Sequence, residues 1–202
     1  MRSSPLILSS NLREFFKHEI TDAAGTLGVS LDDLLEYYVV NLLCDFSRSD
    51  QSPTPGEEPL AFIYKRAVEA SPLERIGHLK ELGDLSLYVA GFFTEFIERS
   101  LVDIDYYISM GGNAYASLSD LLGAQPSGDT FAEVYSDLAD RFPEVVDVLN
   151  EVNDRSMDSS DNDTDLLRLY DRWQKTKSQR IERKLTEKGL IPVESPNSEY
   201  VQ

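Results

Sequence analysis

Apolar residues recur every three or four positions along most of the chain, which is the spacing of one face of an α-helix. No stretch shows the sustained alternation of apolar and polar residues that is typical of a strand. We therefore expect an all-α fold, a single-domain bundle of six or seven helices over residues 1–189. The pattern predicts helices at about residues 10–24, 30–47, 59–70, 71–99, 100–122, 130–156 and 164–189.

The most apolar part of the pattern, residues 71–122, is expected to form a central buried helical hairpin over which residues 130–189 close. The segment SRSDQSPTPGEE is rich in Ser, Pro, Gly and charge, and such a composition cannot bury apolar area, so we predict a mobile loop at residues 48–57. Residues 190–202 contain two prolines and little apolar content, which predicts a disordered C-terminal tail.

Four helix starts are marked by a capping box, in which a Ser or Thr and an acidic residue three positions later satisfy free backbone amides of the first turn. The pairs are Ser30 with Asp33, Ser71 with Glu74, Ser100 with Asp103, and Thr130 with Glu133. Pro72 follows Ser71 at a position where proline loses no hydrogen bond, so this start is the best defined.

Pro143 and several glycines interrupt the helical pattern. Pro143 removes a backbone donor inside the 130–156 segment, so the helix must kink or restart there. A glycine in a helix interior costs roughly 0.5–1 kcal/mol relative to alanine, which predicts that glycines here serve a bend or a close helix crossing. The glycines in the two central segments are Gly77, Gly83, Gly91, Gly111 and Gly112.

Composition places the chain among globular proteins. Of its 202 residues 41% are hydrophobic, enough for one core. The lone cysteine, Cys44, lies in an apolar run, which indicates a reduced core residue and a cytoplasmic protein. The N-terminal apolar patch is shorter than the roughly 7–15 residues of an export signal. The apolar stretch 85–97 is shorter than the ~20 residues that span a bilayer, so we expect no membrane segment.

Metal and catalytic motifs are missing from the sequence. A di-iron helical bundle needs Glu three residues before each of two histidines, but Phe15 precedes His18 and Arg75 precedes His78. No Gly-x-Ser-x-Gly, phosphate-loop or dinucleotide fingerprint occurs. We therefore expect no metal and no cofactor, and the sequence favours a non-enzymatic protein.

Polar residues are interleaved with apolar ones across the central segments, and a buried polar group without a partner costs ~1–3 kcal/mol. In one interpretation the tyrosine rings pack in the core and their hydroxyls bond to carboxylates. In the other, a break at Gly111-Gly112 opens a ligand pocket at residues 103–115. Solid packing at Tyr107 and Asn113 would favour the first interpretation. The candidate ligand-binding residues are Asp84, Tyr88, Asp105, Tyr106, Tyr107 and Asn113.

Charge is distributed unevenly along the chain. The 36 acidic residues against 19 Lys and Arg give a net charge of −17. Residues 166–189 hold eight bases and three acids, a net charge of +5 that leaves −22 for the rest of the chain. An acidic line with helical spacing precedes this basic segment: Glu133, Asp137, Asp140, Glu144, Asp147, Glu151, Asp154 and Asp158. The opposite, apolar face comprises Phe131, Val134, Leu138, Phe142, Val145, Leu149 and Val152.

The acidic line has three interpretations: a solvated face, a face neutralised by the basic helix in an antiparallel hairpin, or a binding face for another, basic protein. Nucleic acid is not expected as a partner, because the field of the whole chain is repulsive. The sequence favours a protein-interaction or regulatory module that uses charged helix faces. The alternative is a ligand-binding or enzymatic bundle at residues 103–115. The candidate partner-binding residues are Glu133, Asp137, Asp140, Glu144, Asp147, Glu151, Arg180 and Arg183.

Overall fold

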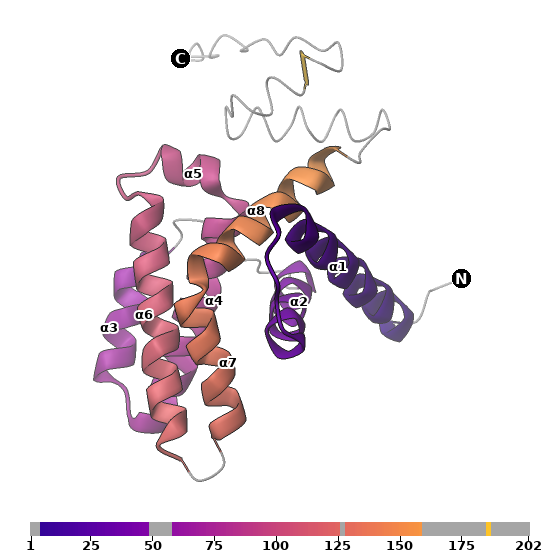
Figure 1. The fold of residues 1–202 in the computed structure, drawn as a ribbon. Coiled ribbons are helices and arrows are strands. Elements are labelled where there is room, and N and C mark those ends of the chain that lie inside the picture. Colours follow the sequence, from indigo (N-terminus) through magenta and orange to yellow (C-terminus); the bar gives the residue numbers. More distant parts are fainter. Residues whose placement is uncertain (1–4, 49–57, 126–127, 159–184, 187–202) are drawn as a thin grey trace, which may run out of the picture. The chain divides into compact units, whose positions relative to one another are not determined.

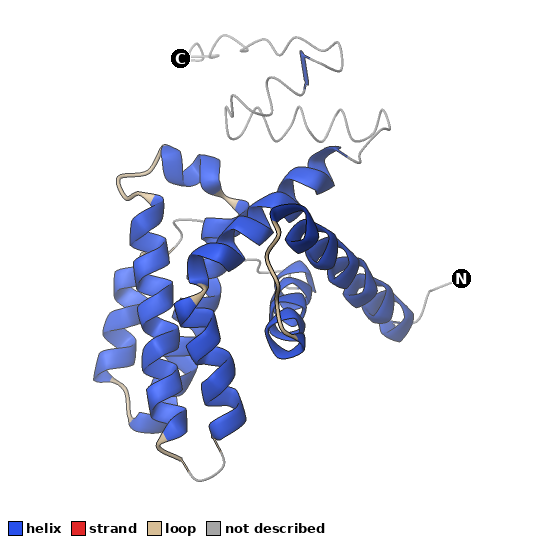
Figure 2. Ribbon diagram, viewed as in Figure 1, coloured by secondary structure: helices blue, strands red, loops and turns tan. Residues whose placement is uncertain are grey.

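The computed structural model describes residues 5–48, 58–125, 128–158 and 185–186, and within these ranges every regular element is a helix (Figures 1 and 2). The predicted all-α bundle is confirmed: the described residues form seven helices of at least ten residues and one additional short helix. They are α1 (Pro5–Leu27), α2 (Asp33–Arg48), α3 (Leu60–Glu69), α4 (Pro72–Phe92), α5 (Thr94–Glu98), α6 (Ile104–Gly123), α7 (Asp129–Asp140) and α8 (Phe142–Asp158).

The chain divides into two compact units, Met1–Asp154 and Arg155–Gln202. Several predictions fall outside the described residues: the mobile loop at 48–57 beyond the end of α2, most of the basic helix at 164–189, and the tail at 190–202. Within the described part of the chain, no helix is both long and apolar enough to cross a membrane.

The central hairpin predicted at residues 71–122 consists of α4 and α6. The two helices run antiparallel, because Gly83 of α4 meets Tyr115 of α6 while Ser86 meets Gly111. Helix α7 then returns along α6, and the rings of Tyr115 and Tyr135 stack with centroids 5.7 Å apart. Leu82 and Leu87 of α4 and Leu118 of α6 are fully buried, so this layer of three helices holds the centre of the core (Figure 1).

Helix α2 joins this layer through aromatic contacts. Phe46 stacks on Tyr88 of α4 at 4.3 Å, and Tyr38 contacts the edge of Tyr135 at 5.5 Å. Helix α1 packs on α2 and runs three residues past its predicted end at residue 24. Gly28 follows its last residue and has a φ of 68°, which suits glycine, and the amide of Val29 donates to the carbonyl of Ala24. These are features of the Schellman termination of a helix.

The capping box at Ser71 and Glu74 is confirmed: the Ser71 amide and hydroxyl both donate to the Glu74 carboxylate, at 3.2 and 2.7 Å. The box predicted at Ser30 is wrong, because Asp32 accepts the amides of Leu34 and Leu35 instead. An aspartate that lies nearer the first turn reaches two amides at once and takes over the cap.

The boxes predicted at Ser100 and Thr130 are also wrong. Asp103 caps α6 itself by accepting the amide of Tyr106 at 3.0 Å, while the Ser100 hydroxyl bonds the carbonyls of Ile97 and Val102 in the preceding turn. Helix α7 begins one residue before Thr130, after Gly128, with no side-chain cap.

Two short interruptions divide segments of continuous helical pattern, one at Arg141 and one at Phe93. The restart predicted at Pro143 is confirmed, since α7 ends at Asp140 and α8 begins at Phe142. The single helix predicted over 71–99 is wrong: the backbone leaves helical geometry at Phe93, with φ −125° and ψ 36°. Beyond the break, the Thr94 hydroxyl donates to Oδ1 of Asn150 on α8 at 2.7 Å, so a tertiary contact replaces helix continuation.

Candidate functional site

Asp84 lies at the centre of a polar cluster that joins α2, α4 and α6. Its Oδ1 accepts the hydroxyl of Tyr38 at 2.5 Å and that of Tyr115 at 2.8 Å. Its Oδ2 accepts the ammonium of Lys80, one turn earlier on α4. The carboxylate is only 14% exposed, and its charge is compensated by the lysine and two hydroxyls. Removing any donor would leave a buried charge with fewer partners, which is strongly unfavourable.

The electrostatics of the cluster keep its tyrosines protonated. Burial, reinforced by the charge of Asp84, raises the pKa of Tyr38 and of Tyr115 far above the ordinary value. Burial alone would lower the pKa of Lys80, but the Asp84 carboxylate outweighs it, so the pKa is raised. The Lys80 ammonium also lies 5.5 Å from the ring centroid of Tyr38. With both carboxylate oxygens engaged and both tyrosines neutral, this arrangement suits helix docking better than proton transfer.

Asp84 is one of the predicted ligand-binding residues, whereas Tyr38, Lys80 and Tyr115, which bond to it, were not predicted. Tyr38 is separated from Asp84 by a helix and a loop, so helical periodicity carries no information on their contact. The spacing of Lys80 and Asp84, four residues apart on one helix, is a signal that could have been used.

The remaining candidate ligand-binding residues do not converge on a pocket. Tyr88 packs among Phe46, Phe92 and Phe93. Asp105 and Asn113 are exposed, Tyr106 is half-buried, and Tyr107 is buried with its ring edge-on to Tyr106 at 5.6 Å.

Helix α6 passes through Gly111-Gly112 without a break, which is contrary to the second of the two interpretations, the ligand pocket. A Cβ at Gly111 would lie 2.3 Å from the ring of Phe142 and 2.7 Å from Cβ of Ser86. The space beside Gly111 is therefore filled by α4 and α8 side chains, and this glycine serves a close helix crossing.

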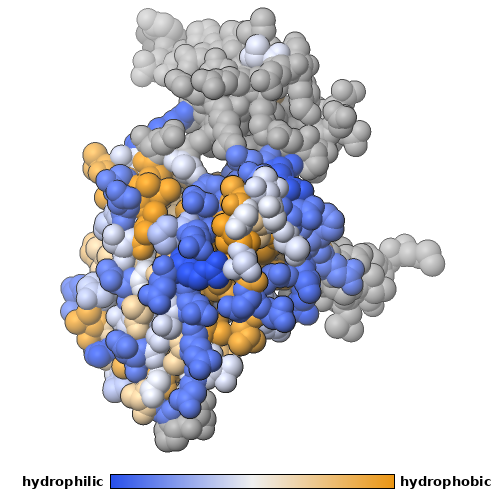
Figure 3. Space-filling model, viewed as in Figure 1, coloured by the Kyte–Doolittle hydropathy of each residue, from blue (hydrophilic) through white to orange (hydrophobic). Residues whose placement is uncertain are grey.

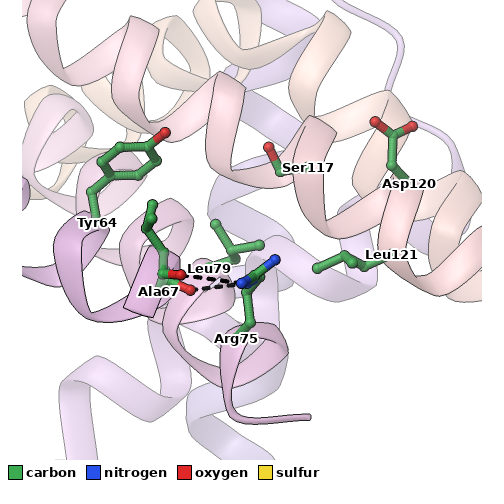
Figure 4. Close-up of a pocket in the computed structure, with 8 residues that line it drawn as sticks. Tyr64, Ala67, Arg75, Leu79, Ser117, Asp120 and Leu121 are labelled. Carbon is green, nitrogen blue, oxygen red and sulfur yellow. Dashed lines mark hydrogen bonds between the residues drawn. The ribbon is translucent and has the colours of Figure 1, made fainter. Parts of the chain in front are cut away.

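A pocket of about 310 Å³ lies elsewhere, between α3, α4 and α6 (Figure 4). Its apolar wall is formed by Ala67, Val68, Leu79 and Leu121. Its polar groups are the phenol of Tyr64, the guanidinium of Arg75, the hydroxyl of Ser117 and the carboxylate of Asp120.

Arg75 is fixed at the end of α3. Its Nε donates to the carbonyl of Ala67 at 3.0 Å, and its Nη2 donates to those of Val68 and Ala70 at 3.1 and 3.4 Å. A helix C-terminus carries unsatisfied carbonyls and partial negative charge, so a guanidinium there caps and stabilises it. The other amino group, Nη1, has no partner within the described residues and points toward the space beside Leu121 (Figure 4).

The acidic line predicted at residues 133–158 lies on two consecutive helices. Glu133, Asp137 and Asp140 of α7 and Asp147 of α8 are exposed, Glu151 is half-exposed, and hydrophilic residues cover α7 in Figure 3. We call the set Glu133, Asp137, Asp140, Glu144, Asp147 and Glu151 the acidic face. Within the described residues its one ion pair joins Glu144 to Arg141 at 2.8 Å.

The apolar face opposite is buried from Leu138 to Val152, as predicted. Phe131 is an exception, because it is 65% exposed at the beginning of α7. Arg180 and Arg183, the basic candidate residues, lie outside the described residues.

Comparison of the chain with protein-family models, with curated proteins and with solved structures finds no match. In the described part of the chain, no three side chains of the kinds that ligate metals come together.

Proposed function

We propose that this protein is a protein-interaction module that binds a basic partner protein through the acidic face of α7 and α8. The observation that carries the proposal is the contrast between the two sides of these helices. Leu138, Val145 and Leu149 are fully buried, whereas the acids of the same helices face solvent. Like charges at this spacing destabilise a helix by ~0.2–0.5 kcal/mol per pair, and a basic partner would relieve that repulsion.

The charge of the surrounding unit supports the same proposal. Residues 1–154 hold 27 acids and 10 Lys and Arg, so the whole net charge of −17 belongs to this unit. A field of one sign attracts a basic partner and repels polyanions, which disfavours nucleic acid. With a single cysteine, 1% exposed, the proposal places the protein in the cytoplasm. The alternative, a ligand pocket at residues 103–115, has less support because Phe142 and Ser86 fill the space beside Gly111.

The test reverses two charges on the acidic face. Asp147→Lys with Glu151→Lys should leave the melting temperature unchanged or slightly raised, because both side chains reach solvent and lie in a repulsive row. The tagged double variant should lose a partner that the wild-type protein recovers from cells and that dissociates as ionic strength is raised.

The matched control changes the net charge by the same amount away from the acidic face. Glu14→Lys with Glu69→Lys alters two exposed residues, on α1 and α3. This control should retain the partner. If both double variants lose it equally, only the net charge matters; if neither does, the acidic face is a solvated surface. Either result rejects the proposal.

A further inference from the structure

The pocket between α3, α4 and α6 has polar groups of opposite charge at different points of an apolar wall. Arg75 extends from α4 and Asp120 from α6, and the two do not form an ion pair with each other (Figure 4). Ser117, one turn before Asp120, also lines the pocket, and both residues are exposed at its edge. Its volume of about 310 Å³ is at the lower end of the range of small-molecule sites.

Apart from the bonds that Arg75 makes to the end of α3, the polar groups of the pocket have no hydrogen-bond partner among the described residues. Within the described residues, no hydrogen bond is made by the side chains of Tyr64, Ser117 and Asp120 or by Nη1 of Arg75. Ser119, two residues from Ser117 on the same helix, instead bonds the carbonyl of Ala132 at 2.7 Å. Arg75 is held by its bonds to the end of α3, whereas Tyr64, Ser117 and Asp120 are exposed and open to a ligand. A few polar groups beside an apolar wall are the usual composition of a ligand site.

The rigidity of Arg75 matters for binding. Its three hydrogen bonds to the end of α3 hold the guanidinium in one orientation. The Arg75 side chain therefore loses little conformational entropy when a ligand accepts a hydrogen bond from Nη1. At the rim, Tyr64 and Val68 are 49% and 55% exposed. An apolar chain lying between them would shield their surface from water.

We propose that this pocket binds a small zwitterion whose carboxylate and ammonium are separated by a short apolar chain. The carboxylate accepts from Nη1 of Arg75, the chain lies against Leu79, Leu121 and Val68, and the ammonium lies at Asp120 and Ser117. A zwitterion has no net charge, so the net charge of −17 on this unit does not oppose its entry as it would oppose a simple anion. This proposal is independent of the acidic face, which lies on α7 and α8.

The test titrates 6-aminohexanoate into the isotopically labelled full-length chain and follows amide signals by NMR. Saturable shifts are expected at Leu79, Ser117 and Leu121, in about the millimolar range that suits a ligand with so few atoms. Hexanoate and hexylamine each lack one charge and should bind about tenfold more weakly or worse. Hexylamine binding as well as 6-aminohexanoate, or absence of any saturable shift, would overturn the proposal.

Substitutions of pocket residues test which residue binds which end of the ligand. Asp120→Asn should weaken 6-aminohexanoate about tenfold and leave the binding of hexanoate unchanged or stronger, whereas Asp105→Asn, an exposed residue of the same helix, should change neither. Because Arg75 also caps α3, its substitution could unfold the protein, so Leu121→Trp serves as the second variant. It should fill the pocket and abolish the shifts while the protein remains folded. Unchanged binding in Leu121→Trp or in Asp120→Asn would refute the site.

Discussion

Gly91 offers the sharpest test of the packing. It is buried in α4, where a Cβ would lie 2.5 Å from Cβ and 2.9 Å from Cδ1 of Leu149 on α8. The Cβ of Leu149 is attached directly to the backbone, so rotation of that side chain cannot remove the clash, and α8 itself would have to shift. Gly91→Ala should therefore destabilise the protein by about 1–3 kcal/mol, the range for overpacking a dense core, and Gly91→Leu should destabilise it more.

Gly77 provides the matched control because it lies on the same helix. A Cβ there would meet no atom within 4 Å, and the residue is exposed. Gly77→Ala should stabilise the protein by about 0.5–1 kcal/mol, since alanine loses less backbone entropy on folding. The same chemical change thus has opposite expected signs at positions 77 and 91.

Urea unfolding at 25 °C measures both free energies. For a chain of this size, 1 kcal/mol corresponds to a shift of about 2–4 °C in melting temperature, so Gly91→Ala should lower the melting temperature by about 2–12 °C. Unchanged m-values would show that the change in the free energy of unfolding does not come from a more compact or more expanded denatured state. If Gly91→Ala melts at or above the wild type, or if Gly77→Ala is equally destabilising, the packing argument is wrong.

The remaining predictions concern hydrogen bonds and titration. Tyr38→Phe keeps the ring but removes a bond to the partly buried Asp84, so urea unfolding should show a loss of about 1.5–3 kcal/mol. Tyr37→Phe, at a residue that is 60% exposed, should show almost none. Because the folded pKa of Tyr38 is raised, its contribution is fully present below the unfolded value near 10 and is lost above it, so stability should fall beyond pH 10 and fall less steeply in Tyr38→Phe. Asp32→Ala should cost about 1 kcal/mol through its two capped amides, and Ser30→Ala close to nothing, by thermal melting.

Local signals predicted most of the fold. Helical periodicity located the helices, and Ser71 and Pro143 marked a start and a restart because their effects act within one turn of the chain. The break at Phe93 could not be predicted in this way, since it accompanies a bond from Thr94 to Asn150, which is far away in sequence. Likewise, a capping box at Ser30 was plausible until Asp32 competed for the same amides.

The candidate sites depended on long-range contacts to different degrees. The exposure of the acidic face could be predicted, because residues spaced by three and four share one side of a helix wherever the helix lies. That the face continues from α7 onto α8 across the interruption at Arg141 is seen only in the structure. The Asp84 cluster and the pocket could not, since each combines side chains from three or more helices. Gly83 and Gly111 predicted a close approach of a neighbouring helix to the backbone of their own helices. Only the structure identifies the side chains that make this approach, Tyr115 at Gly83 and Phe142 at Gly111.

The glycine crossings also restrict how this unit can change shape. At Gly83, Gly91 and Gly111, side chains of one helix rest against the backbone of another, so sliding by a fraction of a turn would drive Tyr115, Leu149 or Phe142 into a main chain. Shear between α4, α6 and α8 is therefore blocked at three points. Helix α1, which rests on α2, has no such crossing at its described glycine, because a Cβ at Gly25 would meet no atom within 4 Å. The same holds for Gly28, which follows the helix. Any rearrangement on binding is expected to involve α1 rather than the layer beneath it.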